Sequence, residues 1–92
     1  MKTTICGVPF VIKQEKTNTF NEGVLGEISL KESEIRIKEE LSKELQDSVL
    51  IHEYLHGILD MNGYHNESSN EQLINCLRNE LYQAGFRVPT YE

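Results

Sequence analysis

Residues 49–59 read Val49-Leu50-Ile51-His52-Glu53-Tyr54-Leu55-His56-Gly57-Ile58-Leu59. Apolar side chains occupy nearly every side of a helix built from this run, so the sequence predicts a central helix that is mostly covered. Ser42 is a suitable N-cap, and Asn62-Gly63 is a suitable stop. The rest of the chain must therefore supply the surfaces that cover this helix.

The chain before position 40 has the pattern of strands. Four segments have this character: Thr3–Cys6, Phe10–Lys13, Val24–Leu30 and Ser33–Lys38. The last of them alternates cleanly, with Ile35 and Ile37 on one face and charged residues on the other. The turn signal Gly7-Val8-Pro9 predicts a hairpin between the first two segments. We therefore expect an α+β fold in which a small antiparallel sheet of three to four strands packs on two helices.

The second helix is predicted from a capping-box pattern. Ser68-Ser69-Asn70-Glu71 has a serine three residues before a glutamate, and an apolar stripe of Ile74, Leu77 and Leu81 follows. Gly85 and Pro89 are typical of the end of such a helix.

Length and charge limit the possible functions. The 92 residues are enough for one domain spanning the whole chain. The net charge of −6 argues against a nucleic-acid partner, because phosphate binding needs clustered Lys and Arg. No run approaches the roughly 20 apolar residues of a membrane span, and Met1–Phe10 lacks the layout of a secretory signal. We expect a cytoplasmic protein in which Cys6 and Cys76 are reduced, with neither a membrane nor a nucleic acid as partner.

The predicted central helix contains the pattern HExxH. Four residues along a helix turn through about 400°, so His52 and His56 lie one turn apart on the same face, where both imidazoles can reach one zinc ion. Glu53 lies about 100° further round, a position that suits a general base acting on water at the ion. Two histidines and a carboxylate would be costly to bury unpaired in an apolar helix, and metal ligation removes that cost.

A catalytic zinc ion usually has three protein ligands, so one more must come from elsewhere. The long motif HExxHxxGxxH fails, and so does the HxxxHxxxxxH arrangement of a zinc endoribonuclease family, because the chain has Leu59 and Asn62 at the required positions. Glu71 is the first remaining candidate, although it also fits the role of a capping-box partner to Ser68. His65 is the second: it is a ligand, a stabiliser of the developing oxyanion, or an exposed loop residue.

Four further residues are candidates for supporting roles. Asp60 lies four positions after His56, so it is either a hydrogen-bond partner of that imidazole or a solvated carboxylate. Tyr64, Tyr82 and Arg78 are candidates for stabilising an oxyanion, and spacing does not choose among them.

The run Ser48–Leu59, followed by a short turn and Asn70-Glu71-Gln72-Leu73-Ile74, resembles the small zinc peptidases of phages and mobile elements that are related to the ImmA/IrrE group. The resemblance extends over Gly23–Tyr82. It implies a minimal zincin fold, with His52 and His56 as zinc ligands, Glu53 as catalytic base and Glu71 as third ligand. It also implies a mobile-element repressor or regulator as the substrate.

We therefore expect a zinc-dependent endopeptidase whose partner is a protein or peptide substrate. If the strand Glu34–Lys38 is an edge, it offers backbone groups to an extended substrate by strand addition. Two other functions remain open: a different hydrolase that uses the same metal, and a non-catalytic zinc-containing module that binds a protein. An intact Glu53 argues against the second, because a structural zinc site needs no base and is usually closed by four ligands.

Overall fold

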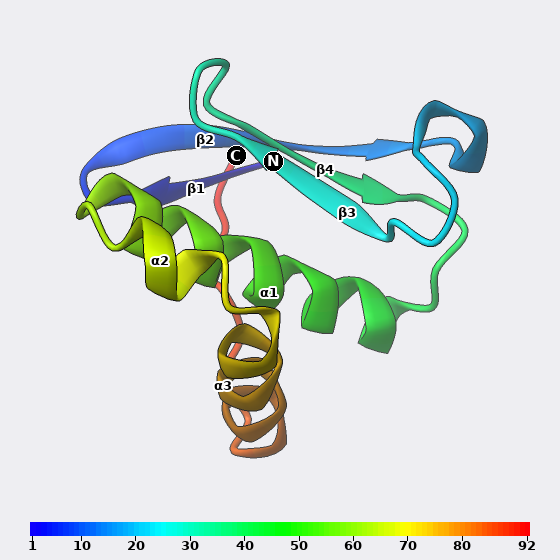
Figure 1. The fold of residues 1–92 in the computed structure, drawn as a ribbon. Coiled ribbons are helices and arrows are strands. Elements are labelled where there is room, and N and C mark those ends of the chain that lie inside the picture. The colour runs from blue at the N-terminus through cyan, green and yellow to red at the C-terminus, as the bar shows by residue number, and fades with distance from the viewer.

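The computed structural model describes residues 1–92 and has the expected α+β class, with a four-stranded mixed sheet and three α-helices (Figure 1). The elements in chain order are β1 (Lys2–Ile5), β2 (Val8–Glu15), the 3-10 helix η1 (Thr17–Thr19), β3 (Gly26–Ser29), β4 (Glu34–Lys38), α1 (Lys43–Met61), α2 (His65–Ser68) and α3 (Glu71–Gln83). The expected pair of helices is accompanied by a third, because α2 forms one short turn between α1 and α3.

The sheet is mixed, so the expectation of a wholly antiparallel sheet is wrong. The strand order is β1-β2-β4-β3, and β2 pairs with β4 in parallel. After β2, the chain runs through η1 and returns as β3 in the opposite direction, leaving a space one strand wide. β4 then fills this space, antiparallel to β3. The segment 16–33, with β3 inside it, is thus the long crossover that a parallel pair requires.

The first hairpin turns at Cys6-Gly7, two residues whose φ angles are +51° and +80°. Positive φ at both central residues is the geometry that matches the twist of a two-residue hairpin. The predicted turn at Gly7-Val8-Pro9 is therefore displaced, and Val8 and Pro9 belong to β2. Pro9 is tolerated there because the pairing of β2 with β4 begins only at Val11, so no neighbour needs the missing N–H.

Helix α1 lies across one face of the sheet, and α3 packs on α1 on the side away from the sheet (Figure 1). The main buried cluster joins the inward side of the strands to α1 and the C-terminal segment: Ile5, Phe10, Ile35, Ile37, Val49, Leu50, Ile51 and Val88. Two glycines set the close approach of helix and sheet. A Cβ at Gly57 would lie 2.9 Å from side-chain atoms of Ile5 and Ile28, and a Cβ at Gly26 would lie 2.7 Å from Cγ1 of Val49.

The ends of α1 follow the sequence signals. The Ser42 hydroxyl accepts a hydrogen bond from the Leu45 N–H, as predicted for an N-cap. At the other end, the N–H groups of Gly63 and Tyr64 donate to the carbonyls of Asp60 and Leu59, which is the Schellman pattern.

The start of α3 differs from the prediction. Asn70, not Ser68, caps this helix: its side chain accepts from the Leu73 N–H. Ser68 is the last residue of α2 and is buried. Glu71 is consequently the first residue of α3 and is not the capping-box partner of Ser68. The expected end is found, because Gly85 has a φ of +93° and follows the C-cap residue Ala84.

The C-terminal segment returns to the sheet and covers part of the β1 edge. Tyr91 exchanges two backbone hydrogen bonds with Lys2, of 2.8 and 2.9 Å, and the Thr3 hydroxyl donates to the Pro89 carbonyl. The Tyr91 hydroxyl also lies 2.9 Å from the hydroxyl of Thr4. At the opposite edge of the sheet, β3 pairs with β4 on its inner side, and its outer side pairs with no segment.

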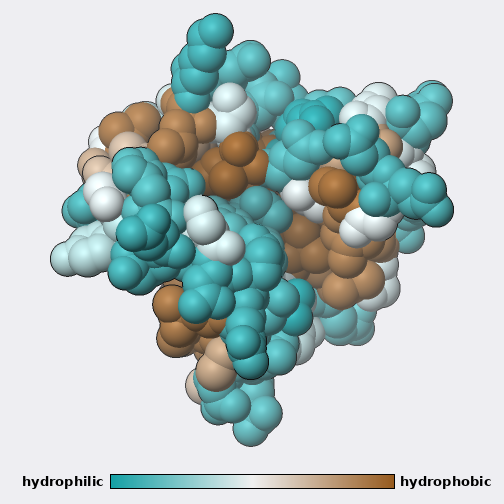
Figure 2. All heavy atoms as spheres, viewed as in Figure 1, coloured by the Kyte–Doolittle hydropathy of each residue, from teal (hydrophilic) through white to brown (hydrophobic).

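The surface is mainly hydrophilic, and its apolar residues appear in several separate patches (Figure 2). Cys6 and Cys76 are both free and exposed. None of the helices combines the length and apolar character needed to cross a membrane.

Candidate metal centre

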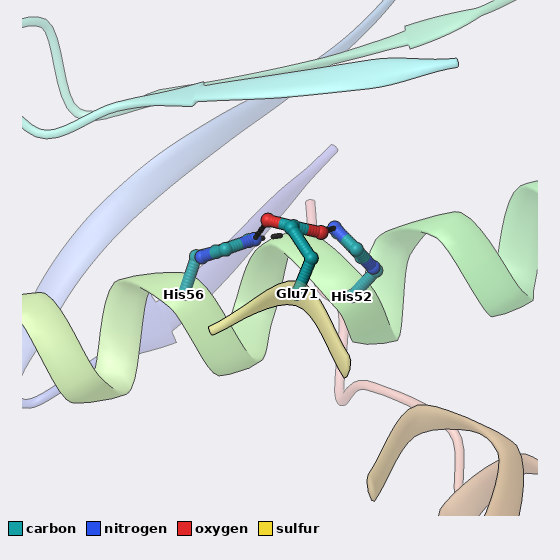
Figure 3. A group of neighbouring side chains, drawn as sticks. All are labelled: His52, His56 and Glu71. Atoms are coloured by element: carbon teal, nitrogen blue, oxygen red, sulfur yellow. Dashed lines mark hydrogen bonds and ion pairs between the residues drawn. The ribbon is translucent and has the colours of Figure 1, made fainter. Parts of the chain in front are cut away.

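Three side chains from two helices converge on one point (Figure 3). His52 and His56 come from α1, and Glu71 comes from the first turn of α3. Nε2 of His52 lies 3.2 Å from Oε2 of Glu71, and Nε2 of His56 lies 2.9 Å from Oε1 of Glu71. The two Nε2 atoms are 3.2 Å apart. The structure thus brings Glu71 to the two histidines.

The converging atoms form a site for a cation. A neutral imidazole with its proton on Nδ1 presents a lone pair at Nε2, and a carboxylate presents only lone pairs. Burial lowers the pKa of His52, and the nearby Glu71 carboxylate opposes this effect only in part, so the neutral ring is favoured. These lone pairs face one another at hydrogen-bonding distance, so a proton or a metal ion placed among them stabilises the arrangement. The cluster can therefore hold a metal ion.

Two residues that sequence reasoning missed orient the histidines. Nδ1 of His52 lies 3.1 Å from Oδ1 of Asn75, and Nδ1 of His56 lies 3.0 Å from the hydroxyl of Ser68. A partner at the second ring nitrogen is what metal-binding histidines almost always have, because it fixes the tautomer and the ring orientation. Asn75 could have been found from its spacing, since it follows Glu71 by one helical turn. The sequence predicts a capping role for Ser68, whereas the structure places its hydroxyl at His56.

Glu53 lies beside the cluster without joining it. The residue is 6% exposed, and a Cβ at Gly26 of β3 would lie 3.5 Å from its Oε2. Burial raises its pKa to about 7, with the carboxylates of Glu71 and Glu27 adding to the shift. No hydrogen bond contributes to this shift. Glu53 is thus a buried carboxyl group that takes up and releases a proton near neutral pH.

A pocket of about 390 Å³ opens onto the cluster. Its walls are the segment before β3, part of α1 and one face of α3: Gly23, Val24, Leu25, Gly26, Val49, His52, Glu53, Glu71, Asn75 and Arg78. The volume far exceeds the roughly 30 Å³ that one water occupies in the liquid. The pocket therefore has room for part of a larger ligand next to the metal site.

The other candidates lie away from the cluster. His65 is an exposed residue of α2, and its Nδ1 is 3.2 Å from Oδ1 of Asp60. The interpretation of Asp60 as the partner of His56 is wrong. Nδ1 of His56 contacts the Ser68 hydroxyl, and Asp60 contacts His65 instead. Tyr64 is 56% exposed. Among the three oxyanion candidates, Arg78 alone lines the pocket.

The Tyr82 ring has a different partner. It lies against the Arg87 guanidinium, whose carbon is 3.9 Å from the ring centroid. This stack occupies the face of the ring, and Tyr82 is absent from the walls of the pocket.

The strand available to an extended ligand is β3. The predicted edge strand, Glu34–Lys38, is β4, which lies between β2 and β3 because it fills the space left by the crossover. Leu25 accepts a hydrogen bond from the Lys38 N–H, so alternation along this antiparallel pair directs the backbone groups of Gly26 and Ile28 away from β4. Gly26 also lines the pocket.

Comparisons of the chain with protein-family models, with curated proteins and with solved structures found no match.

Proposed function

We propose that this chain is a zinc-dependent endopeptidase of the zincin type, which hydrolyses peptide bonds of a protein substrate in the cytoplasm. The observation that carries the proposal is the position of Glu53, a buried carboxyl group beside three converging metal-ligating groups. The resemblance of residues 23–82 to the small zinc peptidases related to the ImmA/IrrE group supports the same function.

Zinc is the metal that best fits these donors. Imidazole nitrogen and carboxylate oxygen bind Zn²⁺ at about 2.0–2.2 Å in tetrahedral sites, which places neighbouring donors about 3.3 Å apart. Here the two Nε2 atoms are 3.2 Å apart, and each lies within 3.2 Å of a different oxygen of the Glu71 carboxylate. Three protein ligands also leave a fourth position, as catalytic zinc sites do and closed structural sites do not.

The chain's own residues supply the proton transfers. A zinc ion bound here would act as a Lewis acid that activates water and polarises the scissile carbonyl. Glu53 accepts one proton of the attacking water while the oxygen of that water bonds to the carbonyl carbon. When the C–N bond breaks, Glu53 returns that proton to the leaving nitrogen. The products are a carboxylate and an amine, and the second proton of the water passes to the amine or to solvent.

The free edge of β3 would hold the substrate. An extended peptide that pairs with the outward groups of Gly26 and Ile28 lies along the pocket that contains Glu53. Backbone pairing positions any sequence, so it explains binding but no preference for particular side chains.

The test compares zinc-loaded protein with two variants on a mixture of unstructured peptides, with products read by mass spectrometry. Glu53→Gln should retain zinc and lose about 10²–10⁴-fold in turnover. Glu44→Gln is the matched control, because Glu44 lies in the first turn of the same helix, far from the cluster in sequence. Turnover that persists in Glu53→Gln would reject the assigned base. Zinc binding without any cleavage by the wild type would instead favour a non-catalytic module.

A further inference from the structure

Arg78 differs from the other arginines in its partners. The chain has three arginines. Arg36 pairs with Glu15 and Glu27, and Arg87 pairs with Asp47. Arg78 has no carboxylate partner, although it is half-buried and lines a pocket that contains two glutamates. An arginine fork that is held in a pocket and lacks a counter-ion is suited to an anionic ligand.

The hydrogen bonds of Arg78 leave one end of its guanidinium free. Nε and Nη2 both donate to Oδ1 of Asn79, at 3.2 and 3.0 Å. This neighbour fixes one side of the planar group. The end formed by Nη1 and the second N–H of Nη2 remains available, and it matches a carboxylate in the end-on bidentate geometry.

The place of Arg78 on α3 sets its distance from the metal centre. Glu71, Asn75 and Arg78 follow one another at steps of four and three residues and all line the pocket, so they share one face of the helix. Seven residues of helix rise about 10 Å. Two extended peptide residues span about 7 Å, and a side chain adds further reach.

We propose that Arg78 binds a carboxylate of the substrate one or two residues from the cleaved bond, which makes acidic peptides the preferred substrate class. This inference rests on the proposed function, because it uses the same pocket and the same metal centre. The carboxylate comes from an Asp or Glu side chain or from the C-terminus of a short substrate, and both sources present the same group to the fork.

The test measures binding and needs no turnover. Three short peptides carry an N-terminal hydroxamate that ligates zinc. The first has Asp and a C-terminal amide, the second has Asn and a C-terminal amide, and the third has Asn and a free C-terminal carboxylate. Affinities are measured by calorimetry with the zinc-loaded chain and with Arg78→Gln, Arg78→Lys and Arg87→Gln. Any change in zinc affinity affects all three probes and cancels in their ratios.

We expect a carboxylate probe to bind the wild type about tenfold more tightly than the neutral probe. Arg78→Gln should abolish this preference, Arg78→Lys should retain part of it, and Arg87→Gln should leave it unchanged. An advantage for the first probe identifies a side-chain carboxylate, and an advantage for the third identifies the chain end. Equal binding of all three probes by the wild type would overturn the inference, and so would a preference that survives in Arg78→Gln.

The two proposals fail in different ways. A carboxylate preference in a chain that cleaves no peptide would keep the role of Arg78 and remove the peptidase assignment. Cleavage without such a preference would do the reverse.

Discussion

The Nδ1 atom of His52 lies 3.1 Å from the amide oxygen of Asn75, and this contact links α1 to α3 at the metal centre. An amide oxygen only accepts hydrogen bonds, so the proton of the neutral ring resides on Nδ1. The lone pair on Nε2 then faces Glu71, which belongs to the same helix as Asn75. The last helix thus contributes both a candidate metal ligand, Glu71, and Asn75, the residue that orients His52.

The ligand set is tested by zinc affinity. His52→Ala and His56→Ala should each abolish stoichiometric zinc binding, because each removes one of three donors. Glu71→Ala should weaken binding strongly, whereas His65→Ala should leave it unchanged, since His65 is exposed and pairs with Asp60. Competition with a chromophoric chelator gives all four affinities. A larger loss in His65→Ala than in Glu71→Ala would contradict the proposed third ligand.

Substitutions of two adjacent serines test whether the Ser68 hydroxyl orients the His56 ring. Ser68→Ala leaves Nδ1 of the half-buried His56 without its partner, so zinc affinity should fall about 10–100-fold. Ser69→Ala is the matched control, because the Ser69 hydroxyl donates to the His65 carbonyl and does not contact the cluster. Similar affinities for the two variants would show that Ser68 does not orient the ligand.

The substitution Gly26→Ala tests whether the absence of a side chain at this position allows β3 to approach α1 closely. In Gly26→Ala the new methyl group would lie 2.7 Å from Cγ1 of Val49 and 3.1 Å from the Arg36 carbonyl oxygen. The free energy of unfolding, measured in urea, should fall by about 1–3 kcal/mol. In the Val49→Ala background the same change should cost less, because the opposing side chain is gone. Additive effects of the two substitutions would argue against this contact.

The Glu53 carboxyl group should make the stability of metal-free protein depend on pH. Its pKa is raised from 4.5 to about 7, mainly by burial, so the folded state holds the proton between these values while the unfolded state has lost it. The contribution of this group to stability is therefore undiminished below pH 4.5 and falls by about 3 kcal/mol as the pH rises through 7.

The measurement is urea unfolding in the presence of a chelator from pH 4 to pH 8. Glu53→Gln carries no titrating proton, so it should match the wild type near pH 4 and be the more stable protein at pH 8. A difference between the two proteins that does not vary with pH would show that Glu53 has an ordinary pKa in the fold.

Much of the fold could be predicted from local patterns, and the errors arose where distant segments decide. The periodicity of Ile35 and Ile37 and the cap at Ser42 depend on neighbours in sequence, and both are found. The parallel pairing of β2 with β4 depends on where a long connection places β3, and spacing carries no signal for that. The displaced hairpin turn reflects a positive φ at Cys6, a residue type that seldom adopts it.

The candidate site was predictable to a similar depth. Helical spacing alone places His52 and His56 one turn apart. The approach of Glu71 requires α2, the short turn that carries Ser68 beneath His56 and brings α3 back to α1. The spacing of Asn75 from Glu71 was a usable signal once Glu71 was a candidate, whereas the role of Ser68 depends on how three helices meet and carries no sequence signal.

The closure of β1 by Tyr91 has a consequence for how copies of this chain can assemble. A sheet with two open edges can add molecules at both ends and grow into a filament. Here the backbone groups of Lys2 already pair with Tyr91, which covers part of the β1 edge and leaves β3 as the more open edge. Pairing between copies is therefore favoured at β3, where two copies can join edge to edge, and hindered at β1. Such a dimer would also cover the strand edge beside the pocket. We therefore expect concentrated protein to lose access to substrate and not to form fibres.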